Sequence, residues 1–202
     1  MAKRSAPEVN AGSMADIAFL LLIFFLVTTT IETDRGISRK LPPIQDEDVD
    51  PPIIKQKNIF TVIVNRNNDL LVEDQLMQLS ELREAAMEFL DNGAGQGEEA
   101  CNYCKGFKDP ASSDNPTKAI ISLVNDRQTE YRTYISVQNE LVAAYNELRN
   151  RESQRMFGMD YTEMEAKYND PNYNGNKEKM EKQIDQVKAM YPQKLSEAEP
   201  KS

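Results

Sequence analysis

One acidic side chain within an apolar stretch is the feature of this sequence best suited to chemistry. Asp16 lies in the run from Gly12 to Thr30, which is otherwise dominated by Leu, Ile, Phe and Val. About 20 mostly apolar residues suffice for a helix to cross a bilayer, and an ionised Asp inside such a span costs roughly 2.5–3.5 kcal/mol. We expect an acid kept at this cost to face a protein partner or a wet cavity. Asp16 is therefore the first candidate functional residue.

A helical projection at about 100° per residue places Asp16 on a face that is polar at both ends and apolar between them. The other members of this face are Gly12, Ser13, Leu20, Ile23, Val27 and Thr30. Leu, Ile and Val side chains carry no hydrogen-bonding group, so this face cannot relay a proton by itself. Partner side chains or water would have to complete the path, and the span thus implies a partner.

Three other interpretations of the apolar run compete with this one. A cleaved signal peptide has a shorter apolar core and a small-residue cleavage site, which residues 28–33 match poorly. A plain signal anchor, with Asp16 snorkelling toward the cytoplasmic headgroups, stays open. A buried core helix is disfavoured because nothing else in the chain is apolar enough to enclose it.

The overall charge excludes some partners and suggests an orientation. The 202 residues have a net charge of −9 and a pI of about 4.7, so the chain lacks the excess of positive charge that is typical of nucleic-acid-binding proteins. The N-terminal tail carries Lys3, Arg4 and Glu8, whereas the far flank opens with Glu32, Asp34 and Arg35, so the bias in basic residues is slight. The positive-inside rule then favours a cytoplasmic N-terminus, with everything after Thr30 outside the cytoplasm.

The residue types needed for most catalytic and metal sites are scarce. The chain has no histidine, and its two cysteines form a lone Cys101-Asn102-Tyr103-Cys104 motif. As zinc ligands they lack two companions, and as a redox pair they lack a preceding strand and a following helix. In an oxidising compartment a small loop disulfide between Cys101 and Cys104 is favoured. We expect no cofactor, no metal site and no enzymatic activity.

The order of the predicted elements indicates an α+β fold. After a tail (1–11), a transmembrane helix (12–31) and a proline-marked, acidic tether (32–57), the sequence predicts a domain over residues 58–202. Its predicted elements are strands at 58–64 and 70–73, a helix over 79–90, a strand at 118–124, helices from near 132 and over 180–191, and an edge strand at 194–197. This order predicts a small α+β sandwich with the helices on one face of the sheet.

Two parts of the predicted domain look like insertions. Residues 93–116 contain the glycine-rich run Gly93 to Gly97 and the cysteine motif. A phosphate loop would lie between a strand and a helix N-terminus, whereas this run follows a helix, so nucleotide binding is disfavoured. Residues 150–192 form the second insertion, of which residues 150–176 are expected to be polar and turn-rich.

The apolar run and its flanks resemble a known membrane segment. Residues 8–17, leading into residues 20–27, resemble the membrane helix of the ExbD/TolR family of biopolymer transport proteins. Leu41-Pro42, the predicted hairpin and the β-α pair over 118–149 follow the family's order. The tail at 196–200 resembles that of Bacteroidetes-type members. Ser13 departs from the family, whose members often have proline there, and both insertions exceed the compact family domain.

The resemblance implies an accessory subunit of a proton-driven motor in the bacterial inner membrane. In such complexes a homodimer of this protein inserts its single-pass helices into a ring of ExbB/TolQ-like subunits. The helix aspartate, here Asp16, takes up and releases protons. Motion then passes through the tether and the periplasmic domain to a TonB-like or Tol-like protein, which energises TonB-dependent outer-membrane transport.

Two alternatives remain at this stage. The chain could be a TolR-like subunit of envelope maintenance, or a passive anchored scaffold whose domain grips peptidoglycan or a partner protein. A scaffold would be indifferent to the protonation of Asp16, whereas a motor subunit would depend on it.

Overall fold

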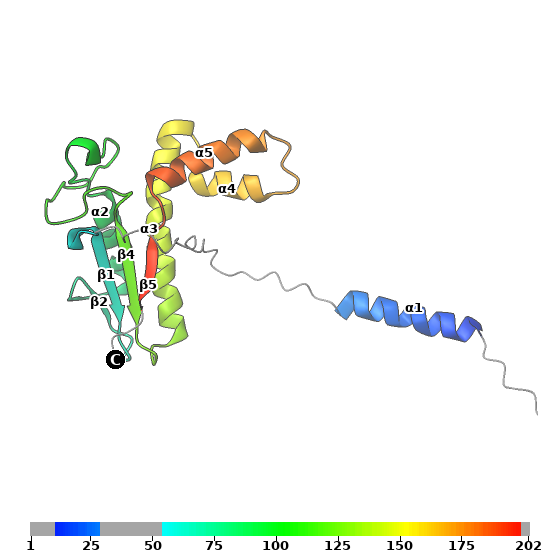
Figure 1. Ribbon diagram of the computed structural model, residues 1–202. Helices are drawn as coiled ribbons and strands as arrows, with labels where there is room; N and C mark the ends of the chain where they lie inside the picture. Colours follow the sequence, from blue (N-terminus) through cyan, green and yellow to red (C-terminus); the bar gives the residue numbers. More distant parts are fainter. Residues whose placement is uncertain (1–10, 29–53, 199–202) are drawn as a thin grey trace, which may run out of the picture. The chain divides into compact units, whose positions relative to one another are not determined.

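The computed structural model describes residues 11–28 and 54–198, and the chain divides into two compact units, Met1–Asp50 and Pro51–Ser202 (Figure 1). The described part of the first unit is helix α1, Ala11–Thr28. The predicted tail at 1–10, Thr30, the Leu41-Pro42 motif and most of the predicted tether lie outside the described residues.

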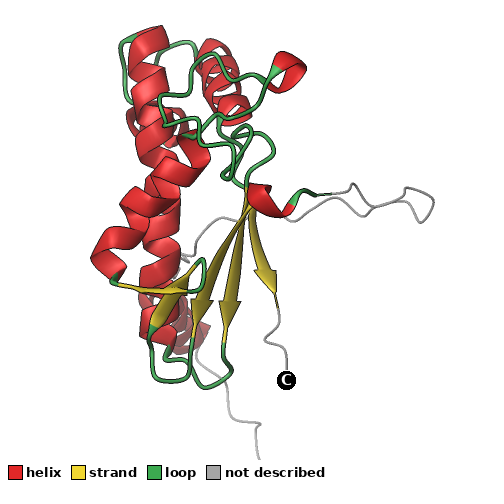
Figure 2. Ribbon diagram, turned by 90° about the vertical axis from the view of Figure 1, so that its left-hand side faces the viewer, coloured by secondary structure: helices red, strands yellow, loops and turns green. Residues whose placement is uncertain are grey.

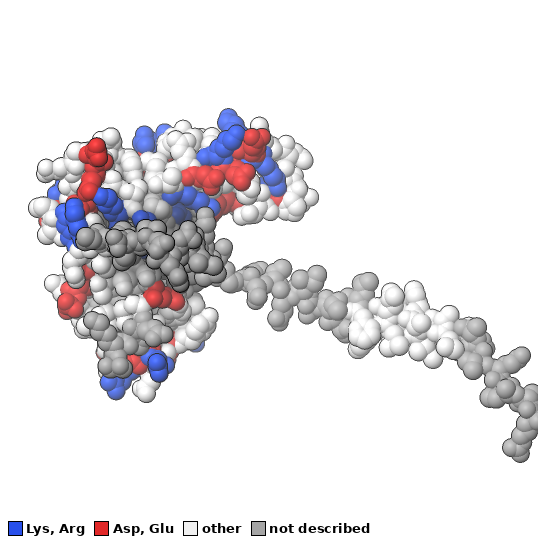
Figure 3. Space-filling model, viewed as in Figure 1, with Lys and Arg blue, Asp and Glu red and all other residues white. Residues whose placement is uncertain are grey.

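Helix α1 has apolar side chains on all sides. Nine large apolar side chains between Met14 and Phe25 are each at least 42% exposed. The face of the helix seen in Figure 3 carries no Lys, Arg, Asp or Glu. A helix that is apolar all round normally lies in a protein core or a membrane, because exposing apolar side chains to water is unfavourable. Within the described residues, no helix combines the length and the apolar character that a bilayer crossing requires.

The second unit contains one five-stranded sheet in the order β3-β2-β1-β4-β5. Its strands are β1 (Ile59–Val64), β2 (Leu70–Val72), β3 (Gln75–Met77), β4 (Ile120–Asn125) and β5 (Leu195–Ala198). The first three form an antiparallel meander, while β4 and β5 pair parallel to β1 and β4, respectively. The β1–β2 hairpin, strand β4 and the C-terminal edge strand β5 agree with the sequence prediction, and β3 is an additional edge strand.

Helices α2 (Leu79–Asp91) and α3 (Tyr131–Phe157) cover one face of this sheet (Figure 2). Alternate residues of β1, namely Phe60, Val62 and Val64, point into the core beneath them. Leu82 and Leu141 of the two helices are fully buried against the same cluster. The period of 2 in the strands and of 3.6 in the helices directs these apolar faces toward each other, which produces the predicted α+β layers.

The region expected to be polar and turn-rich is largely helical, and this prediction was wrong. Helix α3 continues to Phe157, where Gly158 at φ +69° ends it, and helix α4 (Tyr161–Asn169) follows directly. The last turns of α3 bury Arg149, Glu152 and Ser153. Polar side chains therefore occupy positions that an apolar stripe would normally mark, and this removed the signal for a helix.

Helix α5 (Lys177–Met190) pairs with α4 and completes a second hydrophobic cluster. Its stripe of Met180, Ile184 and Val187 was predicted from the sequence, and these side chains pack against Tyr161 and Met164 of α4. Asn176 caps α5 by accepting a hydrogen bond from the backbone N–H of Lys179. The added helices thus possess their own small core.

Candidate functional site

The described structure places Asp16 near the start of α1, on the helix face predicted from the sequence. Its carboxylate is exposed, and no described residue pairs with it. Leu20 and Ile23, one and two turns further on, are 58% and 42% exposed. Ser13 and Val27 also belong to α1, whereas Thr30 lies outside the described residues. The chain itself therefore provides this acid with an apolar flank and no described hydrogen-bonding partner.

Such an acid can act as a two-state switch. In its ionised form a carboxylate requires polar neighbours, and in its neutral form it tolerates apolar contact. Among the described residues, α1 offers Asp16 no such polar neighbour. Gain or loss of one proton would then change which surroundings the helix prefers.

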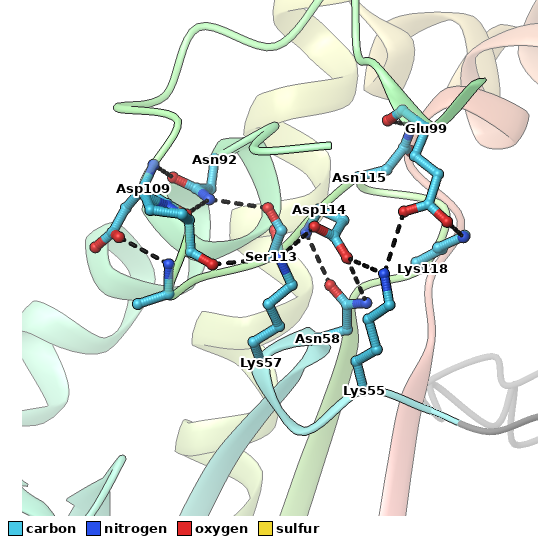
Figure 4. A network of polar contacts seen from close by, with 12 residues as sticks. Lys55, Lys57, Asn58, Asn92, Glu99, Asp109, Ser113, Asp114, Asn115 and Lys118 are labelled. Atoms are coloured by element: carbon cyan, nitrogen blue, oxygen red, sulfur yellow. Dashed lines mark hydrogen bonds and ion pairs between the residues drawn. The ribbon is translucent and has the colours of Figure 1, made fainter. Parts of the chain in front are cut away.

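A second acid, Asp114, joins the end of the predicted tether to the sheet domain (Figure 4). Its side chain is only 5% exposed, and Lys57 Nζ lies 2.5 Å from Oδ1. Lys55 Nζ lies 3.4 Å from Oδ2, and Asn58 Nδ2 donates to the same oxygen. In return, Asn58 Oδ1 accepts a hydrogen bond of 2.8 Å from the Asp114 backbone N–H. The residues that lead into β1 are thus fixed to the loop of residues 93–116.

The charge of Asp114 is favoured despite its burial. Desolvation alone would raise the pKa of a carboxyl group, because it disfavours the charged form. The hydrogen bonds from Lys57, Asn58 and Lys55 outweigh this effect and hold the pKa of Asp114 below its ordinary value. Glu99 extends the network by pairing with Lys55 and Lys118.

A buried asparagine organises the same loop from the other side. The side-chain amide of Asn92 donates to the carbonyls of Asp109 and Ser113, and its Oδ1 accepts from the Asp109 N–H. The Ser113 hydroxyl donates to the carbonyl of Phe89 at the end of α2. Backbone groups that a loop would otherwise leave unpaired are satisfied in this way.

The two cysteines close a short ring within this loop. Cys101 and Cys104 are joined by a disulfide bond, with their Cα atoms 5.5 Å apart. Gly93, at φ +65°, lies against this bond, and a Cβ there would be 2.6 Å from the Cβ of Cys104. Only glycine fits this position, because both the backbone angle and the space exclude a side chain. Gly93 therefore serves close packing at a helix end.

A buried ionic cluster connects this loop with the C-terminal helices. Arg151 of α3 makes two hydrogen bonds to Asp91 at the end of α2, of 2.6 and 2.8 Å. The Tyr191 hydroxyl, beyond α5, donates to Asp91, and Tyr103 of the cysteine loop stacks edge-on against the Tyr191 ring. Burial and the bond to Asp91 raise the pKa of Tyr191, so the hydroxyl stays protonated.

A hollow of about 540 Å³ lies over α2 and α3, and some of its charged lining residues are paired with one another. Its lining includes Arg83, which is paired with Glu140 at 2.8 Å and with Glu147 at 2.9 Å. The one cation in this lining is thus already neutralised. Among the described residues, no group of three Cys, Asp or Glu side chains could hold a metal ion.

The sequence singled out Asp16 and the cysteines, but it gave no indication of Asp91, Asn92, Asp114 or Arg151. Asp91 and Asn92 were interpreted only as a helix stop, since a polar pair before glycine is typical of one. Asp114 is one of many acids in a polar loop, and its partners lie 56 to 59 positions away in the chain. Only the fold brings them together.

Comparison with known proteins relates the chain to a protein family. No curated protein matches the sequence significantly. The family described as Biopolymer transport protein ExbD/TolR matches residues 2–151, a range that includes Asp16, the sheet through β4 and most of α3. Helices α4 and α5 and strand β5 lie beyond the match. Since the matched range covers well over half of the chain, this protein belongs to the ExbD/TolR family of biopolymer transport proteins.

Proposed function

We propose that this chain is the proton-coupled accessory subunit of an ExbB/ExbD-type motor in the bacterial inner membrane, and that the motor energises TonB-dependent outer-membrane transport. Membership of the ExbD/TolR family assigns the chain to biopolymer transport. The observation that carries the finer proposal is Asp16, an acid on an otherwise apolar helix with no described partner in its own chain.

The proposed membrane span comprises residues 12–31 and thus extends three residues beyond α1. It is supported by the apolar side chains exposed all around the helix, because contact of these side chains with water is unfavourable. In this arrangement the N-terminus is cytoplasmic and the sheet domain is periplasmic. The Cys101–Cys104 disulfide fits this placement, since disulfides persist in oxidising compartments such as the periplasm.

The proposed mechanism uses the membrane potential to change the surroundings of Asp16. Moving one charge through 100 mV releases roughly 2.3 kcal/mol, which is comparable with the cost of an ionised Asp in a span. A ring of ExbB/TolQ-like subunits would provide the polar neighbours of the ionised form. The tether, fixed to the domain at Lys55 and Lys57, would transmit the resulting motion to a TonB-like protein.

A homodimer is supported by the uncovered face of the sheet. Paired residues on this face form one apolar row across all five strands, and these are Leu76, Leu71, Ile63, Val124 and Ala198. Leu76 is 76% exposed, and no described helix covers the row (Figure 2). A second copy of the domain would remove this apolar surface from water.

Replacement of Asp16 by Asn tests the proposal, because Asn keeps the size of the side chain and cannot ionise. We expect Asp16→Asn to reach normal levels in the membrane fraction and to reduce TonB-dependent uptake to background. Asp185→Asn, at an exposed position of α5, is the matched control and should leave uptake unchanged. Normal uptake by Asp16→Asn would refute proton coupling and leave an anchored scaffold, with peptidoglycan or a partner protein as its ligand.

A TolR-like role in envelope maintenance is the second candidate, since the family comprises both types. Copurification distinguishes the two. A TonB-like protein captured with the intact complex supports nutrient import, whereas a Tol-like protein supports envelope maintenance.

A further inference from the structure

The loop that contains the disulfide presents one strongly exposed aromatic side chain to the solvent, three residues beyond Cys104. Phe107 is 86% exposed, which is more than any other large apolar side chain in the described residues. Single exposed apolar residues are common on protein surfaces, so exposure alone assigns no role. At Phe107, however, the backbone on both sides is fixed in place.

The residues that flank Phe107 are attached to the end of α2. The Gly106 N–H donates to the Asp91 carbonyl at 3.0 Å, and the Lys108 N–H donates to the Asn92 carbonyl at 3.2 Å. A Cβ at Gly106 would lie 2.5 Å from the Asp91 oxygen, and Lys108 adopts the unfavourable φ of +57°. These constraints hold the Phe107 ring outward, and the loop cannot bury it without breaking them.

The surroundings of Phe107 carry unpaired positive charge. Lys105 and Lys108 are exposed, and neither forms an ion pair with any residue that the structure describes. The adjacent Asp109 is also exposed, and one of its oxygens accepts a hydrogen bond from the Ala111 N–H. In a chain with a net charge of −9, a phenyl ring between two such lysines is a local exception.

This loop lies at the end of the domain where the tether enters. Lys57 Nζ donates to the Pro110 carbonyl at 3.2 Å, three residues from Phe107. The loops at this end of the sheet, from which β1 and β4 start, are seen together in Figure 2. Phe107 is therefore three residues from the point at which Lys57, at the end of the predicted tether, contacts this loop.

We propose that residues 101–108 form a membrane-contact loop, in which Phe107 enters the headgroup region of the anionic bilayer while Lys105 and Lys108 contact lipid phosphates. The inference rests on the proposed function, because the span must hold the domain near the bilayer. One aromatic ring and two lysines bind lipid weakly by themselves, but a covalent anchor supplies a high local concentration of surface. The loop would thus dock the domain reversibly.

A bilayer fits these observations better than a peptide does. The hollow that this loop forms with Arg155 is lined by Asn102, Tyr103, Cys104 and Lys105 of the loop, and Phe107 is not part of it. A peptide would need a groove around its contacts, whereas a bilayer accepts a protruding ring flanked by cations. The two lysines also complement anionic headgroups, each contributing about fivefold to binding near such a surface.

The chain contains no tryptophan, so a single Trp can report on this contact. We would reconstitute full-length Phe107→Trp into nanodiscs of phosphatidylglycerol and phosphatidylcholine and record its emission. We expect a shift to shorter wavelength relative to detergent micelles, and quenching by lipids brominated near the headgroup. Adding Lys105→Gln and Lys108→Gln should lower the ratio of docked to free domain about 25-fold, which is the product of the two lysine contributions.

Tyr131→Trp is the matched control. Tyr131 is 76% exposed at the start of α3, which follows the opposite end of the parallel strands. Its emission should be the same in nanodiscs and micelles. Lys182→Gln, an exposed lysine on α5, controls for the loss of charge and should leave the Phe107→Trp spectrum unchanged.

Three outcomes would overturn the proposal. The first is a Phe107→Trp emission that does not change in anionic nanodiscs. The second is equal quenching of Tyr131→Trp by the brominated lipids. The third is an emission shift of Phe107→Trp that arises only when a protein partner is added. Failure of the proposed membrane anchor would be seen separately, because the chain would then not elute with the nanodiscs at all. The Asp16→Asn variant should dock normally, since docking does not involve proton transfer.

Discussion

At the scale of single residues, two carboxylates of this chain have opposite surroundings. Asp114 is buried and receives hydrogen bonds from three side chains, whereas Asp16 is exposed on an apolar helix with no described partner. The first arrangement is complete within one chain and stabilises the fold. The second is incomplete, as expected of a group that works against another subunit.

The charge state of Asp114 should affect how the free energy of unfolding depends on pH under acidic conditions. Its pKa is lower in the folded than in the unfolded chain, for which the reference value is 3.8, so its stabilisation is full above about pH 4 and is lost as pH falls further. We expect Asp114→Asn to lower the free energy of unfolding at pH 7 by about 1–3 kcal/mol.

Below pH 4 the curve of this variant should be flatter than that of the wild type. Urea unfolding at pH 7, 5, 4 and 3 measures both effects, and Asp185→Asn controls for loss of an exposed acid. Parallel curves for Asp114→Asn and the wild type would contradict the assigned role.

At the scale of elements, the loop between α2 and β4 is ordered without regular secondary structure. Apart from the short 3₁₀ turn Gly97–Glu99, it is held by the disulfide, by Asn92 and by the contacts of Asp114. The Asn92 and Asp114 contacts attach the loop to different elements, the end of α2 and the start of β1. The result is a loop that can fix Phe107 and connect the tether to α2.

Removal of the disulfide should loosen this loop and leave the sheet intact. A four-residue disulfide ring restricts the unfolded chain by about 2 kcal/mol in the chain-entropy model, so Cys101→Ser with Cys104→Ser should lose about that much stability. Hydrogen exchange should rise over residues 102–109 and stay slow in β1 and β4. The wild type in strong reductant should reproduce the variant. Unchanged exchange in the loop would show that its other contacts suffice.

At the scale of the whole second unit, two hydrophobic clusters share one long helix. The main cluster lies between the sheet and helices α2 and α3, and the second lies between α4 and α5. Helix α3 contacts α2 on one side and α4 and α5 on the other, and the half-buried Arg151 of α3 donates a hydrogen bond to the buried Tyr191 hydroxyl. The helices beyond the family match are thus a separate layer added to the sheet domain.

The two clusters should respond differently to cavities. Ile184→Ala should cost about 2–5 kcal/mol and accelerate hydrogen exchange in α4 and α5, while β1 and β4 remain protected. Leu141→Ala in the main cluster should cost a similar amount and accelerate exchange throughout the unit. If Ile184→Ala also opened the sheet strands, the two clusters would be one cooperative unit.

Local patterns in the sequence were sufficient for much of this fold. The alternation at 59–64, the helical spacing at 79–90 and the stripe from Met180 to Val187 are signals contained within a few turns of chain. The same holds for Asp16, because one charge within an apolar run stands out without any tertiary information. Family membership and the order of most of the domain's elements could therefore be predicted from the sequence.

The tertiary structure alone decided what the polar residues do. The sequence at the end of α3 is polar although this segment is partly buried, because Arg149 and Glu152 are buried with polar partners rather than through apolar contacts. Asp114 acquires its role from lysines more than 50 positions away, and Asp91 from Arg151 and Tyr191, 60 and 100 positions away. Ion pairs and hydrogen bonds have no sequence period, so only folding reveals which polar groups meet.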